Sequence, residues 1–171
     1  FLVTLATMTI CKGLVLSVSQ GISHYGLPDF YPALGLGSIG PIPIPILVML
    51  FSFLVGYILL SKTVFGRKVY AVGGNPDAAR VSGINVEMTI LLTFLIVGLF
   101  SGLSSLVLTS RLNSFSPAMG LGFEFSSIAA VVIGGTSLAG GEGNIGGTLI
   151  GVLIMGVINN ALNLLGVSVY Y

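Results

Sequence analysis

Residues 88–108 form a run of 21 residues without a single charged side chain. An α-helix needs about 20 predominantly apolar residues to cross the hydrocarbon core of a bilayer. This run therefore predicts a membrane-spanning helix, and it restricts the rest of the chain to structures that are compatible with lipid.

The composition extends this constraint to the whole chain. Charged residues make up 6% of the sequence and hydrophobic residues 54%, and the mean hydropathy is +1.08. About a quarter of the residues in a typical soluble domain are charged. So few charges cannot cover a surface that faces water, and we expect an all-α, polytopic transmembrane bundle. The net charge of +1 gives no indication of nucleic-acid binding.

The apolar runs together predict five spans, and we treat residues 1–171 as a single transmembrane domain. Their approximate bounds are 1–19, 44–61, 88–108, 125–140 and 145–166. Lys12 interrupts the first span, where we expect it to face protein or to reach an interface. Cys11 is the single cysteine, so no internal disulfide can form, and we expect it to be buried in a helix. The chain starts inside an apolar run without an initiator Met, and we interpret it as a fragment of a longer protein.

The polar loop 62–87 contains four of the six basic residues. Short loops rich in Lys and Arg lie on the cytoplasmic side of a membrane. Residues 20–45 and 109–124 should then lie on the opposite side. Residues 20–45 contain five of the seven prolines, which disfavours helix there.

Within this loop, Gly73-Gly74-Asn75-Pro76 predicts a turn, because Gly tolerates positive φ and Pro fixes φ. A short helix is predicted to follow, with Asn75 as its N-cap, Pro76 as its first residue and Asp77 at its positive end. Gly83 should end this helix. A short capped helix exposed on the cytoplasmic side is suited to bind a soluble partner.

The glycine-rich stretch near 134–147 permits two structures. One is a broken or re-entrant helix, since irregular backbone at membrane depth survives only when protein or a water-filled cavity surrounds it. Thr136 and Ser137 would then offer hydroxyl groups near its tip. The alternative is two helices joined by a tight glycine turn around Glu142.

Three asparagines in the last span, Asn159, Asn160 and Asn163, share a sector of about 100° on a helix. Carboxamide groups cannot face lipid without hydrogen-bonding partners. They either join neighbouring helices or line a polar route through the membrane.

Enzyme motifs are absent from the sequence. It contains no nucleophile elbow, no HExxH, and no glycine-rich loop that ends in GK[ST]. The one histidine, His24, has no second ligand at metal-binding spacing. We expect no catalytic residue, no metal and no bound cofactor.

Two stretches carry a family resemblance. FGRKVYAVGGNPDAARVSGINV and IAAVVIGGTSLAGGEGNIGGTLIGVLIMGVINNALNLLGVSVYY together resemble the permease subunit of bacterial ABC importers for ribose and related simple sugars. NPDAARVSGINV is also similar, more distantly, to the loop of branched-chain amino acid permeases. The resemblance covers nearly the whole chain.

The resemblance implies a helical permease that forms half of a pore in the bacterial inner membrane. Its implied partners are an ATP-binding cassette ATPase that binds and hydrolyses the ATP, a sugar-binding protein, a second permease subunit and the lipid bilayer, and they include no nucleic acid. The residues that correspond to the ATPase-docking loop of the family are Asn75, Asp77, Ala78, Ala79 and Gly83, with Asp77 in place of the glutamate of the EAA pattern.

Two other functional classes compete with this interpretation. A secondary transporter or channel driven by an ion gradient needs titratable groups inside the spans, and Lys12 alone qualifies. A purely structural scaffold does not explain a capped polar helix on the cytoplasmic face. The sequence leaves the solute open among ribose, other pentoses or hexoses, inositol and a furanose-type signalling molecule.

Overall fold

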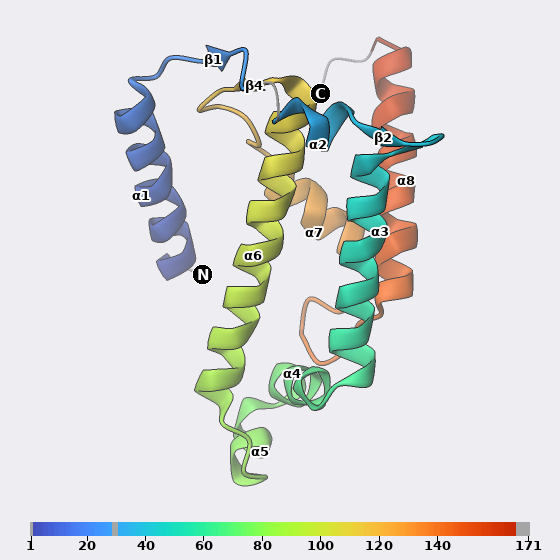
Figure 1. Ribbon diagram of the computed structural model, residues 1–171. Coiled ribbons are helices and arrows are strands. Elements are labelled where there is room, and N and C mark those ends of the chain that lie inside the picture. Colours follow the sequence, from blue (N-terminus) through green and yellow to red (C-terminus); the bar gives the residue numbers. More distant parts are fainter. Residues whose placement is uncertain (1, 29–30, 167–171) are drawn as a thin grey trace. The chain divides into compact units, whose positions relative to one another are not determined.

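The computed structural model describes residues 2–28 and 31–166, so Phe1 of the first expected span and residues 167–171 lie outside the description. The helices are α1 (Leu2–Ser19), α2 (Pro32–Leu36), α3 (Ile44–Tyr57), α4 (Val64–Gly74), α5 (Pro76–Val81), α6 (Val86–Leu112), α7 (Phe123–Ile133) and α8 (Ile145–Leu164), and a π-helical turn, η1 (Ile58–Lys62), follows α3 directly (Figure 1). Four two-residue strands, β1 (His24–Tyr25), β2 (Ser38–Ile39), β3 (Ile42–Pro43) and β4 (Ser114–Phe115), form two antiparallel pairs, β1 with β4 and β2 with β3.

Four helical segments of the described chain are long and apolar enough to cross a membrane. They are α1, α3 together with η1, α6 and α8. The predicted fold class, an all-α polytopic membrane protein, is confirmed. At most 6% of the residues in each of these spans are buried, so their apolar side chains are available to lipid or to other helices.

The first span contains one wrong prediction. Cys11 lies in α1 as a free thiol, but its side chain is exposed and not buried. The reason is that α1 as a whole buries only Ser19 among the described residues.

The chain divides into two compact units, residues 1–48 with 101–121 and residues 49–100 with 122–171. In the first unit, the two loops predicted to share one side of the membrane are joined. His24 pairs with Phe115 and Tyr25 with Ser114. The Asn113 side-chain oxygen accepts a hydrogen bond from the Leu27 amide at 3.1 Å. This pairing is compatible with the prediction that the two loops lie on one side of the membrane.

Helix α2 is a difference from the sequence-based expectation for residues 20–45. It has only five residues, and Pro32 occupies its first turn, where the missing N–H of proline costs no hydrogen bond. Its Gly35 lies so close to the backbone of Arg111 that a Cβ atom would overlap it. The proline content therefore excludes a long helix from this loop but not a short helix of five residues.

In the second unit, the chain turns sharply between η1 and α4. Thr63 caps α4, because its hydroxyl oxygen accepts a hydrogen bond from the Gly66 amide at 3.2 Å. Gly66 is buried against the backbone of Leu60, where a side chain would not fit. The corner between the two helices therefore depends on one threonine and one glycine.

The predicted turn at residues 73–76 is wrong, because α4 extends to Gly74. Gly73 and Gly74 are the last residues of α4, and neither has a positive φ. Only Asn75 lies between α4 and α5, as the C-cap of the first and the N-cap of the second. Glycine is required at position 73 by the close approach of another backbone, as described below, rather than by its conformational freedom.

The predicted caps of α5 are confirmed. The Asn75 side chain accepts a hydrogen bond from the Ala78 amide at 3.0 Å, Pro76 is the first helical residue, and Asp77 lies in the first turn. Gly83 has a φ of 82° and follows the C-cap Ser82. This left-handed conformation ends the helix and favours glycine.

Helix α7 has 11 residues, which span about 16 Å, roughly half of a bilayer core. It ends at Ile133, short of the expected 140, and irregular backbone continues to Asn144, the N-cap of α8. Gly134 packs against Gly147, and Gly151 packs against the Ala130 carbonyl so closely that a Cβ would overlap it. α7 and α8 are therefore two antiparallel helices, and the irregular connection 134–144 between them is longer than the tight glycine turn of the second alternative.

Candidate functional site

The segment α4–α5 and the start of α6 forms a small folded body with its own core. Val72 of α4, Ala79 of α5 and Val86 of α6 are buried together, and Ile84 packs against them. Of the residues predicted to dock an ATPase, Ala79 belongs to this core at 4% exposure, whereas Asn75, Asp77, Ala78 and Gly83 are exposed. We call residues 75–87 the docking segment.

Charged side chains surround Arg80 on the docking segment. Its guanidinium lies 3.6 Å from the Asp77 carboxylate and 3.3 Å from the Glu87 carboxylate. All three side chains are largely exposed, so these ion pairs contribute little stability and mainly orient Arg80. The neighbouring Val81 is 91% exposed. The segment thus presents the exposed Val81 side chain beside a cluster of three charged side chains.

Thr136 and Ser137 lie in the irregular segment after α7. The Thr136 amide donates to the Val131 carbonyl, and the Ser137 amide donates to the Glu142 carbonyl, both at 3.1 Å. The Ser137 hydroxyl accepts a hydrogen bond from the Ala139 amide. These contacts shape the turn between α7 and α8, and both side chains are half-buried.

The three asparagines lie on α8 in exposed positions. Because Gly147 and Gly151 face α7, the helical wheel places the centre of the Asn159, Asn160 and Asn163 face about 150° away, on the side of α8 opposite α7. The asparagines therefore do not join α8 to α7.

The predicted pathway residues form two groups. Thr136 lies beside Gly143, just before α8 begins, and Asn160 lies roughly 20 Å further along that helix. The structure does not bring the hydroxyl-bearing pair and the asparagine face together into one site.

A contact that sequence reasoning missed joins α4 to the turn 140–143. The Tyr70 hydroxyl donates a hydrogen bond to the Gly143 carbonyl at 2.9 Å. Gly140 and Gly141, with φ of 93° and 76°, lie against the backbone of Gly73 and Gly74 so closely that side chains would not fit between them. The apolar spacing of Phe65, Val69 and Val72, together with the cap at position 63, is the signal that could have located α4, but it does not reveal this contact.

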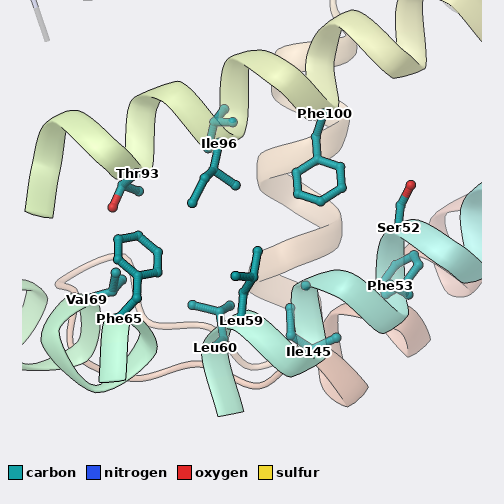
Figure 2. A pocket seen from close by; sticks show the side chains of 12 residues that line it. Ser52, Phe53, Leu59, Leu60, Phe65, Val69, Thr93, Ile96, Phe100 and Ile145 are labelled. Carbon is teal, nitrogen blue, oxygen red and sulfur yellow. The ribbon is translucent and has the colours of Figure 1, made fainter. Parts of the chain in front are cut away.

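A cavity of about 390 Å³ lies between α3, α4 and α6 in the second unit. Figure 2 shows Thr93, Ile96 and Phe100 of α6 pointing towards the side chains of Phe65 and Leu60. Ser52 and Thr93 bring the only hydroxyl groups to this lining, and the Thr93 hydroxyl donates to the Thr89 carbonyl at 2.8 Å. A sugar needs many hydrogen-bonding partners, so this apolar cavity does not suit one.

Metal ligands are not clustered in the part of the chain that the structure describes. No group of three or more His, Cys, Asp or Glu side chains there could hold an ion.

These features define a polytopic helical membrane protein with a folded polar segment between two of its spans. The chain belongs to the family of the permease component of the branched-chain amino acid transport system, whose family model matches residues 1–171. The resemblance found in the sequence is thereby confirmed.

Curated relatives match over the full length of this chain. It is 49% identical to the ribose import permease protein of Bacillus subtilis and 44% identical to that of Haemophilus influenzae, in both cases over 100% of this chain and 54% of the relative. It is 43% identical to the D-allose transport system permease protein of Escherichia coli, over 100% of this chain and 52% of the relative. The chain thus spans about half the length of these relatives. No solved structure matches it.

Proposed function

We propose that this chain is part of the permease subunit of an ATP-driven importer for a simple sugar. The observation that carries the proposal is its 43–49% identity, over its whole length, to permeases named for ribose and allose. The small core that α4 shares with the docking segment supports it, since a binding surface for a soluble subunit needs a fixed shape.

In this proposal the ATPase is a separate subunit that binds to the docking segment. Val81 and the oriented Arg80 are the side chains offered to it. The permease itself binds no ATP and catalyses no reaction. A second permease subunit completes the pore, a sugar-binding protein delivers the substrate on the opposite face, and the assembly lies in the bacterial inner membrane.

The asparagine face of α8 is proposed to line the sugar route, together with Thr136 and Ser137 at the other end of that helix. Carboxamides both donate and accept hydrogen bonds, so they match sugar hydroxyls without the cost of burying a charge. This face lies on the side of α8 opposite α7, so its carboxamides do not take part in the packing of α8 against α7. That position supports a lining role.

Reconstitution in vesicles tests this function. The complete permease is assembled with its ATPase and the sugar-binding protein, and radiolabelled ribose, allose and arabinose are supplied in turn. We expect uptake that requires ATP, and the preferred sugar identifies the substrate. Uptake driven by an ion gradient without ATP would show instead that the protein is a secondary transporter.

A further inference from the structure

The structure connects the docking segment to α8 through a short series of direct contacts. Asn75 is the single residue between α4 and α5, and it caps both helices, so no flexible linker separates them. Helix α4 contacts the turn 140–143 through the Tyr70 hydroxyl and through Gly73. Asn144, the next residue after that turn, caps α8 by accepting a hydrogen bond from the Gly146 amide at 2.9 Å.

The contact between α4 and the turn 140–143 is a close packing of two backbones. Gly140 and Gly141 both have positive φ, a backbone conformation that residues with a side chain rarely adopt. A Cβ at position 141 would lie 2.7 Å from the Gly74 Cα. Backbone therefore meets backbone, with no flexible side chain between the two segments. Tyr70 supplies a side-chain hydrogen bond at this contact, and it reaches a carbonyl 73 residues away in the sequence.

We propose that Tyr70 is a positioning residue that holds the turn 140–143 against α4, so that displacement of the docking segment reaches α8. The inference rests on the proposed function, because that function supplies the ATPase that would displace the segment. The inference adds to that function the specific contact, between Tyr70 and the turn 140–143, through which α8 responds to the ATPase. Helix α8 is the helix that carries the asparagine face. A merely structural role for Tyr70 would be to stabilise the fold without affecting this response.

The first test measures the joint itself, without any transport. Spin labels are attached to Lys68→Cys on α4 and to Leu138→Cys, two residues before the turn 140–143, in a Cys11→Ala background; both positions are exposed. We expect a narrow distance distribution with Tyr70 and a broader one in Tyr70→Phe, which removes only the hydroxyl. Tyr57→Phe is the matched control, since it removes a hydroxyl from α3 and keeps the ring that lies 5.9 Å from the Lys62 ammonium. An unchanged distribution in Tyr70→Phe would overturn the inference.

The second test measures coupling in the complete importer. Loss of one hydrogen bond should lower sugar uptake and sugar-stimulated ATP hydrolysis per assembled complex by about fivefold in Tyr70→Phe, with basal hydrolysis unchanged. Tyr57→Phe should behave like the unsubstituted protein. If Tyr70→Phe only reduces the amount of complex and leaves uptake per complex intact, the role is structural and the inference fails. If the unsubstituted importer shows no ATP-dependent uptake, the proposed function fails, while the distance measurement still decides whether Tyr70 holds the turn.

Discussion

Single residues determine the two ends of the docking segment. Asn75 closes α4 and opens α5 with one side chain, and Gly83 ends α5 in a left-handed conformation. A Cβ at position 83 would meet nothing within 4 Å, so the reason for glycine there is its backbone conformation and not a lack of space.

Gly83→Val is expected to disturb the docking segment through backbone strain alone. A β-branched residue in the left-handed region costs about 1–2 kcal/mol, which should alter the path from α5 into α6. We expect sugar-stimulated ATP hydrolysis to fall while the permease still assembles in the membrane. Gly83→Asn is the matched control, because asparagine tolerates this conformation, and it should retain most of the stimulation. Intact stimulation in Gly83→Val would show that the segment does not dock the ATPase.

Asn160→Leu separates a lining role of the asparagine face from a packing role. If the face lines the route, uptake per assembled complex should fall while the melting temperature in detergent is unchanged. An asparagine that only joins helices should instead cost about 0.6–2 kcal/mol of stability when replaced. Normal uptake per complex with a lower melting temperature would assign Asn160 to helix packing.

At the scale of elements, α7 and α8 pack through glycines. Gly134 approaches Gly147, and Gly151 approaches the Ala130 carbonyl, so the two helices meet backbone to backbone at the point where α7 ends. Such small residues permit close helix packing in lipid. Gly156, further along α8, has open space where a Cβ would be.

Gly151→Ala should therefore destabilise the α7–α8 pair, whereas Gly156→Ala should not. The added methyl group at position 151 overlaps the Ala130 carbonyl, and overpacking of this kind costs about 1–3 kcal/mol. At position 156 the same change enters open space and improves helix propensity. Melting temperatures of the two variants in detergent provide the comparison, and equal values would contradict the observed packing.

Elements governed by local sequence could be predicted, and those governed by distant contacts could not. The caps of α5 depend on residues within a few positions of each other, and the sequence pattern located both. The residue that follows α7, Gly134, contacts Gly147, and α4 contacts Gly140 and Gly143; neither contact can be read from the local sequence. For the candidate site, the asparagine face followed from helical periodicity, but the position of Thr136 beside Gly143 depends on the irregular connection 134–144.

At the scale of the whole molecule, the chain has few buried side chains. The four long spans bury 0–6% of their residues within the described structure, and α6 alone extends over 27 residues. Such exposed apolar surfaces are stable only in contact with lipid or with other helices. The chain spans about half the length of the relatives that it matches.

The membrane orientation of the whole chain can be tested with single cysteines in a Cys11-free background. The bias of basic residues predicts that loop 62–87 lies in the cytoplasm, so cysteines at Ser38 and Ser116 should react with an impermeant thiol reagent in intact cells. Ser116 is half-buried and should react more slowly than the exposed Ser38. A cysteine at Ser82 is also exposed but should be protected until the cells are opened. Labelling of Ser82 with protection of the other two would reverse the orientation.

The small core formed by Val72, Ala79 and Val86 has a consequence for protein engineering. Its residues all come from one stretch of chain, and threonine, asparagine and glycine caps define the helices within it. We expect residues 63–87 to behave as an interchangeable cassette. A chimera that carries this cassette from another importer should recruit the ATPase of the donor while it keeps the sugar preference of the host, provided that the donor segment also carries the glycine and tyrosine that meet the turn 140–143.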